Sequence, residues 1–217
     1  MSLMDELGEL LSEPKHVIHN FYNKLAWDKT ITINDLTNLL YSGLDMDINQ
    51  IYIFACGTGD LDKVKFLLSQ GADINHDHSM GLRYAIAEQN KNIIDFLLEN
   101  GIDFFNEGVM WDAIESHNIP MVKLLLDNGF IVKNELVLPI IQNIATTVYN
   151  NNDDLTSDIT IIKLFIEQGI DPNIFTKYYL EYIFPAKASH NKFLSLMQNT
   201  GANFNTVISE LLETKTT

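Results

Sequence analysis

The sequence predicts an all-α protein made of repeated helix pairs, because one local pattern closes five stretches of the chain. Each stretch is a leucine-rich helix followed by a glycine and a short polar segment, with the glycines at Gly71, Gly101, Gly129, Gly169 and Gly201. The intervals between these glycines are 30, 28, 40 and 32 residues. A period of this length, with a helix, a glycine and a turn at each step, is typical of a helical solenoid.

A second, shorter helix precedes the leucine-rich one in the three best-matched units. Segments 50–71, 80–101 and 108–129 align without a gap, and each has alanine at its sixth position. A small side chain there lets neighbouring helices approach closely, while the second helix carries apolar residues at i, i+3 and i+4. Glycine ends the second helix because the residue after the helix adopts positive φ, where a side chain would be strained.

The ends of the chain follow the same pattern less closely. Residues 32–49 are predicted to form the second helix of a pair, with a capping box made by Thr32 and Asp35. Residues 14–29 are predicted to form the first helix of the same pair. The fourth unit is lengthened by an Asn/Asp-rich insertion, and the fifth is also divergent. We therefore expect about six helix-pair units with degenerate ends.

The predicted organisation is a single domain with four parts. Residues 1–49 form N-terminal helices and a degenerate capping repeat, 50–133 three well-matched repeats, 134–205 two divergent repeats, and 206–217 a C-terminal helix or tail. The insertion near 150–158 is either a tolerated disordered loop or an element that contacts a partner. The terminal units are either caps or dimer surfaces, and we expect a monomer.

The charge of the chain limits its partners. The net charge is −15, and residues 1–110 carry 17 acidic against 7 basic side chains, whereas residues 111–217 carry 12 against 7. So negative a surface repels nucleic-acid phosphates and anionic membranes. We expect a protein partner with a basic surface, no nucleic acid and no membrane, with electrostatic attraction strongest in the N-terminal half.

Little in the sequence indicates catalysis. Cys56, the only cysteine, stands beside the predicted core alanine, which favours an inert buried thiol in a reducing compartment. The His76-Asp77-His78 run has no further metal ligands marked by spacing and is interpreted as a solvated turn. No apolar run is long enough for a membrane span, and the N-terminus lacks a basic signal region. We expect a cytoplasmic, non-catalytic protein without cofactor or metal.

The three aligned units, and above all the run GDLDKVKFLLSQGADIN at 59–75, resemble the ankyrin repeat. The Ile- and Asn-rich composition of the chain is similar to that of ankyrin-repeat proteins of intracellular bacteria and large DNA viruses. The resemblance implies finger-like connections between the helix pairs, here shorter than usual. No unit keeps the Thr-Pro-Leu-His start of the family. The hydrogen bonds that this Thr and His make between repeats should therefore be missing.

The resemblance also implies a concave contact surface built from the fingers and one flank of the inner helices. The family's contact positions fall here on Asp47, Asn49, Thr58, His76, Asp77, Ser79, Glu88, Phe104, Phe105, Glu107, Glu115 and Ser116. Phe104 and Phe105 form either an exposed anchor ringed by acids or part of the core, and the two rings can divide these roles. Asn75 resembles the asparagine that an asparaginyl hydroxylase modifies in ankyrin repeats, so it is a candidate modification site.

These observations support three functions to different degrees. The first is a non-catalytic module that grips a partner protein through an acidic concave face. The second is an inhibitor, such as an immunity or regulatory protein, that occludes a basic enzyme site. The third is an enzyme, or the non-catalytic part of a host-targeted effector whose catalytic domain lies elsewhere.

Overall fold

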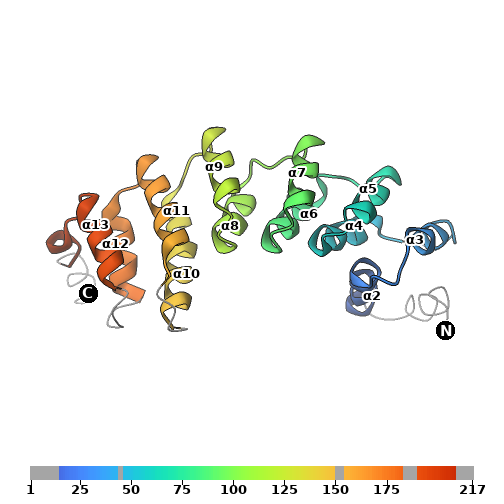
Figure 1. Cartoon of the computed structure of the whole chain (residues 1–217), viewed down its shortest axis with the longest axis horizontal. Coiled ribbons are helices and arrows are strands. Elements are labelled where there is room, and N and C mark those ends of the chain that lie inside the picture. The colour runs from blue at the N-terminus through green and yellow to red at the C-terminus, as the bar shows by residue number, and fades with distance from the viewer. Residues whose placement is uncertain (1–14, 44–45, 150–153, 183–189, 209–217) are drawn as a thin grey trace. The chain divides into compact units, whose positions relative to one another are not determined.

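The computed structural model describes residues 15–43, 46–149, 154–182 and 190–208 (Figure 1). Within these ranges the chain forms helices joined by turns and contains no strand, so the all-α prediction is confirmed. The chain divides into two compact units, Met1–Asp112 and Ala113–Thr217. We call them unit 1 and unit 2 and describe each by itself.

Unit 1 consists of three helix pairs and the start of a fourth. The elements are α2 (Lys15–Trp27), α3 (Ile33–Leu40), α4 (Ile48–Thr58), α5 (Leu61–Ser69), α6 (His76–Ala87), α7 (Lys91–Glu99) and α8 (Glu107–Glu115), which ends in unit 2. The first helices of the pairs, α2, α4 and α6, pack in sequence against one another (Figure 1). We call these the inner helices; α5 and α7 are outer helices, packed on α4 and α6 respectively.

Unit 2 is also built of helices joined by turns. Its elements are α9 (Ile119–Asp127), a 3₁₀ turn (Asn134–Leu136), α10 (Val137–Tyr149), α11 (Thr156–Glu167), α12 (Pro172–Tyr182) and α13 (His190–Asn199). Helix α10 packs against α11 and α12, and α13 packs on α12, where the Tyr179 and Phe193 rings stack at 3.9 Å. The helices α2 to α13 therefore make six pairs in the described part of the chain, which confirms the predicted number.

The features that predicted the repeats have the expected roles. Ala55 and Ala85 are fully buried on the inner helices α4 and α6, and Ala113 is fully buried on α8. The repeat glycines all have positive φ, for example 101° at Gly71. The capping box predicted for α3 is present, because Asp35 N donates to Thr32 Oγ1 at 3.2 Å and Thr32 N donates to Asp35 Oδ2 at 2.8 Å.

The insertion near 150–158 is shorter than the sequence suggested. It lies between α10 and α11, as expected, but α11 begins at Thr156 and includes the end of the predicted insertion. Asp158, expected to protrude, has a side chain only 2% exposed. The expectation that Asp158 protrudes is therefore corrected. Its carboxylate is held inside because Asp158 Oδ1 lies 3.0 Å from His117 Nε2. Residues 150–153 lie outside the described residues.

Candidate functional site

The fingers are short turns, each shaped by an aspartate, which begins an Asp-x-Asn segment at 73–75 and is followed by two phenylalanines at 103–105. Residues 70–75 separate α5 from α6, and residues 100–106 separate α7 from α8. In each finger the aspartate side chain accepts a hydrogen bond from the backbone N–H two residues on. This bond runs from Asn75 N to Asp73 Oδ1 at 2.9 Å and from Phe105 N to Asp103 Oδ1 at 3.1 Å. Such Asx turns fix the direction of the carboxylate.

The asparagine of one finger holds the backbone of the next finger. Asn49 Oδ1 accepts from Asp73 N at 2.8 Å, and Asn75 Oδ1 accepts from Asp103 N at 2.7 Å. In unit 2, Asn173 Oδ1 accepts from Asn203 N at 2.7 Å. Side-chain amides thus connect successive repeats here, where the sequence predicted only the absence of the Thr and His hydrogen bonds.

These bonds assign a structural role to two residues that were expected to act at the surface. Asn49 was expected to contact a partner, and its amide oxygen is instead occupied by the next finger. Asn75 is exposed, but its amide oxygen also holds the next finger. Hydroxylation of Asn75 stays a prediction.

The surface of the fingers in unit 1 is acidic, and we call it the finger face. Its exposed carboxylates belong to Asp47, Asp73, Asp77, Asp103 and Glu107. Among the described finger residues 46–49, 71–79 and 101–107 there is no Lys or Arg. The exposed lysines among the side chains of unit 1 that the structure describes lie elsewhere, at Lys24, Lys29, Lys65 and Lys91. The described finger residues thus carry exposed acids without a basic side chain, whereas the helices of unit 1 carry exposed acids and exposed lysines together.

The residues predicted to contact a partner differ in exposure. Those that are exposed are Asp47, Asp77, Glu88, Phe105, Glu107 and Glu115, and those that are half-buried are Asn49, Thr58, His76, Phe104 and Ser116. Glu115 and Ser116 belong to unit 2 and the others to unit 1. The expectation that Ser79 contacts a partner is corrected. It is only 1% exposed, because its hydroxyl donates to the Asp103 carbonyl oxygen and ties α6 to the following finger.

Phe104 and Phe105 divide their roles. Phe105 is 47% exposed, whereas Phe104 is half-buried. Phe105 stands between the carboxylates of Asp103 and Glu107 in sequence, and its backbone N–H is held by Asp103. The finger face therefore includes one exposed aromatic ring on a turn of fixed geometry.

The start of α6 is a left-handed turn that the sequence did not reveal. Asp77, His78 and Ser79 have φ values of 48°, 55° and 61°, so the regular helix begins after them. A non-glycine residue in this region costs roughly 1–2 kcal/mol. The turn exposes Asp77 and His78 while it directs Ser79 inward.

No catalytic arrangement emerges from the described residues. Cys56 is fully buried, and burial raises the pKa of its thiol to about 12, so the thiolate is scarce at neutral pH. No group of three or more His, Cys, Asp or Glu within the described ranges could hold a metal ion. Of the helices that the structure describes, none has the length and apolar content needed to cross a bilayer.

Two polar residues, the buried Lys63 and the half-buried Asn90, stabilise the repeats and carried no signal in the sequence. Lys63 on α5 donates from Nζ to the Ala26 and Asp28 carbonyl oxygens at 3.1 and 3.0 Å, at the end of α2. Asn90 Nδ2 donates to the Gly57 carbonyl oxygen at 2.8 Å, near the end of α4. Each side chain reaches from the start of one outer helix to the preceding inner helix.

Comparison with known proteins identifies the repeat. A family model described as "Ankyrin repeats (3 copies)" matches residues 31–107 and 51–136. One ankyrin repeat protein of Acanthamoeba polyphaga mimivirus is 24% identical over 98% of this chain and 33% of its own length. A second from the same virus is 26% identical over 61% of this chain and 26% of its own length. The chain thus spans a third or less of these relatives. The crystal structure of the human ASB11 ankyrin repeat domain is similar in fold, with a TM-score of 0.54 at 19% identity over 84% of each chain.

Proposed function

Because residues 31–136 of this chain are ankyrin repeats, we propose that it is a non-catalytic module that binds another protein through the finger face of unit 1. Ankyrin repeats are generally protein–protein interaction modules. The observation that carries the proposal is the uniform sign of charge on the fingers of unit 1, where five exposed carboxylates have no Lys or Arg among them in the described finger residues. A surface of this kind favours a partner with a basic patch.

Phe105 supplies the apolar part of the proposed contact. An exposed aromatic ring on a rigid turn loses little conformational freedom on binding, and aromatic residues dominate the energetics of interfaces. The surrounding acids set the rate of encounter and its dependence on salt. The Asx turns keep the Asp73 and Asp103 carboxylates in place before the partner arrives, which lowers the cost of ordering them.

The test is partner capture with charge-neutral variants that preserve the fingers. Asp73→Asn together with Asp103→Asn removes two charges, while asparagine can still accept the same backbone N–H in an Asx turn. The matched control is Asp62→Asn together with Glu99→Gln, two exposed acids on the outer helices. We expect the finger variant to capture at least about fivefold less partner at low salt, and the control to behave as the wild type.

Phe105→Ala completes the test. We expect it to weaken capture at both low and high salt, because removal of an apolar anchor is not screened by ions. If neither the finger variant nor Phe105→Ala changes what is captured, the finger face is not the contact surface and the proposal fails. Adding the captured partner's own activity assay then distinguishes an inhibitor from a binding module without inhibition.

A further inference from the structure

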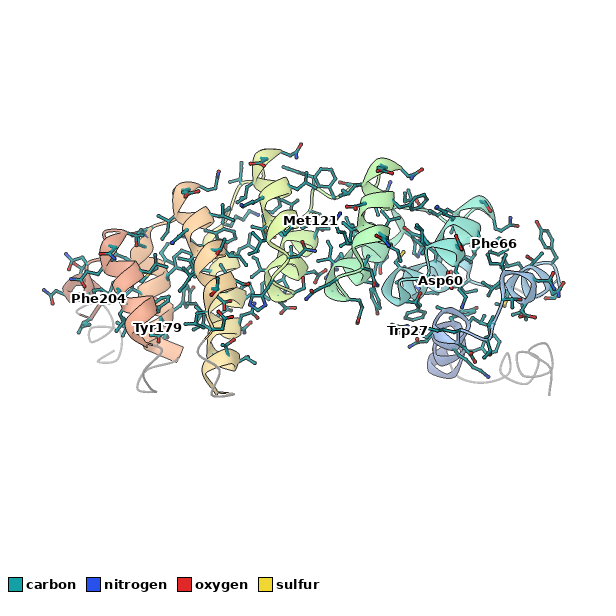
Figure 2. All side chains as sticks on the ribbon, viewed as in Figure 1. Trp27, Asp60, Phe66, Met121, Tyr179 and Phe204 are labelled. Carbon is teal, nitrogen blue, oxygen red and sulfur yellow. The ribbon has the colours of Figure 1, made fainter. Side chains whose placement is uncertain are left out.

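Two asparagine–glycine pairs stand at the C-terminal ends of helices. Asn100–Gly101 follows α7 in unit 1 and Asn128–Gly129 follows α9 in unit 2, and the sequence contains no other such pair. Figure 2 labels Met121, which lies on α9. Both asparagines and both glycines are exposed. A Cβ added at either glycine would meet no atom within 4 Å, so water has access to both pairs.

An asparagine followed by glycine is chemically labile, because glycine has no side chain to hinder attack by its backbone nitrogen. In this reaction the Gly101 nitrogen gives up its proton and bonds to the Asn100 Cγ atom. The Cγ–Nδ2 bond breaks, and Nδ2 leaves as ammonia with that proton. Water then opens the cyclic succinimide at either carbonyl, which leaves aspartate or isoaspartate at position 100. The reaction consumes water and needs no enzyme.

In the folded chain both reacting groups of unit 1 are held by hydrogen bonds. Asn100 Nδ2 donates to the Phe96 carbonyl oxygen at 2.7 Å, so the side-chain amide is turned back toward α7. Gly101 N donates to the Leu98 carbonyl oxygen at 3.2 Å. The reaction requires the amide carbon and the glycine nitrogen to face each other closely, so these two bonds have to break first.

The pair in unit 2 is held in the same way. Asn128 Nδ2 donates to the Leu124 carbonyl oxygen at 2.8 Å. Gly129 N donates to the Leu126 carbonyl oxygen at 2.9 Å. The end of α9 therefore has to open before Asn128 can react.

The finger that follows Gly101 is anchored to the start of α6 and the finger before it. Asp103 N donates to Asn75 Oδ1 at 2.7 Å, and the Asp103 carbonyl oxygen accepts from the Ser79 hydroxyl. Ile102, which connects Gly101 to Asp103, is 3% exposed. The chain beyond Gly101 is therefore kept against unit 1 while these contacts hold, and loss of the Asn75 bond makes the end of α7 easier to open.

We propose that Asn100 and Asn128 are sites of spontaneous deamidation, and that the Asn75 bond controls the rate at Asn100 by controlling how often the finger opens. The ends of helices open locally more often than a whole domain unfolds, so the reaction proceeds from the native protein. The inference is independent of the finger-face proposal, because it needs no partner.

Deamidation of Asn100 leaves a lasting change in the finger. The product carboxylate cannot donate to the Phe96 carbonyl oxygen, and its charge is unfavourable at the C-terminal end of α7, where the helix dipole is negative. Isoaspartate also adds a methylene group to the backbone just before Gly101. A finger that has opened and reacted therefore closes less tightly, and it has gained a negative charge.

The chain contains matched controls at the same position of two other repeats. Gln70 and Gln168 precede Gly71 and Gly169, which also have positive φ. Glutamine would have to close a larger ring, which is a slower reaction. These two positions therefore report whether glycine at a helix end is sufficient by itself.

The experiment measures deamidation at each position. The full chain is kept at mildly alkaline pH, either folded or in concentrated guanidinium chloride. Peptides that contain positions 70, 100, 128 and 168 are then quantified by mass spectrometry at intervals. In denaturant we expect Asn100 and Asn128 to react at similar rates and both glutamines to stay unmodified. In the folded protein we expect both asparagines to react at least about tenfold more slowly.

Variants test the role of the Asn75 bond. Asn75→Ala removes the acceptor for Asp103 N, and loss of one neutral hydrogen bond should raise the folded-state rate at Asn100 about three- to tenfold. The rate at Asn128 should not change. The matched control is Asn49→Ala, which removes the equivalent bond to the preceding finger and should leave both rates near those of the wild type. Asn100→Gln should abolish the reaction at position 100 alone.

Four results would overturn the inference. The first is no deamidation at Asn100 or Asn128 in denaturant, and the second is an equal rate at Asn100 in the folded and unfolded chain. The third is an Asn75→Ala variant that leaves the rate at Asn100 unchanged or raises it equally at Asn128, which would indicate global unfolding. The fourth is reaction of the glutamines as fast as Asn100. None of these results bears on partner capture, so the proposed function is tested separately.

Discussion

Replacing Lys63 with methionine should destabilise unit 1, because a buried cation holds the end of α2. Lys63 is 4% exposed. Its Nζ atom donates to the carbonyl oxygens of Ala26 at 3.1 Å and Asp28 at 3.0 Å, and reaches that of Leu25 at 3.5 Å. The nearest carboxylate oxygen, Asp60 Oδ2, is 3.9 Å away. The ammonium group thus caps one helix from the start of another.

The magnitude follows from these bonds. A hydrogen bond from a charged donor contributes about 1.5–3 kcal/mol, and Lys63 makes two with short distances. Methionine keeps most of the apolar stem in place, so little packing is lost. Burying the ammonium group has its own cost, which the substitution removes. We therefore expect a net loss of about 2–4 kcal/mol in the free energy of unfolding.

The assay is urea unfolding followed by far-ultraviolet circular dichroism, with Lys65→Met as the matched control. Lys65 is exposed, and its ammonium group lies 5.4 Å from the centroid of the Phe96 ring. Loss of that contact should change the free energy of unfolding by less than about 1 kcal/mol. If Lys63→Met and Lys65→Met unfold at the same urea concentration as the wild type, the capping argument is refuted.

Two further predictions concern pH and packing. The hydrogen bond and charge of Asp158 raise the pKa of His117 above its ordinary value of about 6.5. The ion pair of protonated His117 with Asp158 thus stabilises unit 2 fully at pH values below about 6.5. This stabilisation is lost as the pH rises through the raised pKa of His117 in the folded protein. Over that pH range, amide exchange in α11 of the wild type should accelerate relative to amide exchange in the Asp158→Asn variant. A difference between the two proteins that stays constant with pH would contradict a stabilising His117–Asp158 ion pair. Gly81→Ala should lower stability by about 1–3 kcal/mol in thermal unfolding, because its Cβ would lie 2.9 Å from the buried Tyr52 ring; Gly57→Ala is the control that should not.

The repeat architecture was readable because each of its signals is local. Each signal reflects what one position needs from its own backbone or its nearest neighbours. These signals are a glycine where φ is positive, an alanine where helices lie close together, and the apolar face of the second helix. They occur at a regular spacing, so the number of helix pairs could be predicted. The capping box at Thr32 and Asp35 was readable for the same reason.

The errors arose where a polar side chain acts across repeats. Ser79 was expected at the surface, yet an unexpected left-handed turn directs its hydroxyl to a carbonyl in the next finger. Asp158 was assigned to a protruding loop, and its partner His117 is distant in sequence. Nothing in the residue types distinguishes a solvated serine or aspartate from one with a buried partner. The bridging role of Asn75 was partly readable, since Asp-x-Asn recurs at 47–49, 73–75 and 171–173.

The Asp-x-Asn finger has a consequence for how such a chain can grow. The aspartate supplies the backbone N–H that the preceding asparagine binds, and the asparagine supplies the acceptor for the following finger. A duplicated segment that ends in Asp-x-Asn would thus offer the backbone N–H to the preceding repeat and the amide oxygen to the following one. Any two copies of the segment could therefore be neighbours. Tandem duplication could lengthen the array without any new interface. A copy that ended at Phe105 would lack the acceptor, so that finger would have to terminate the series or bind its successor by other means.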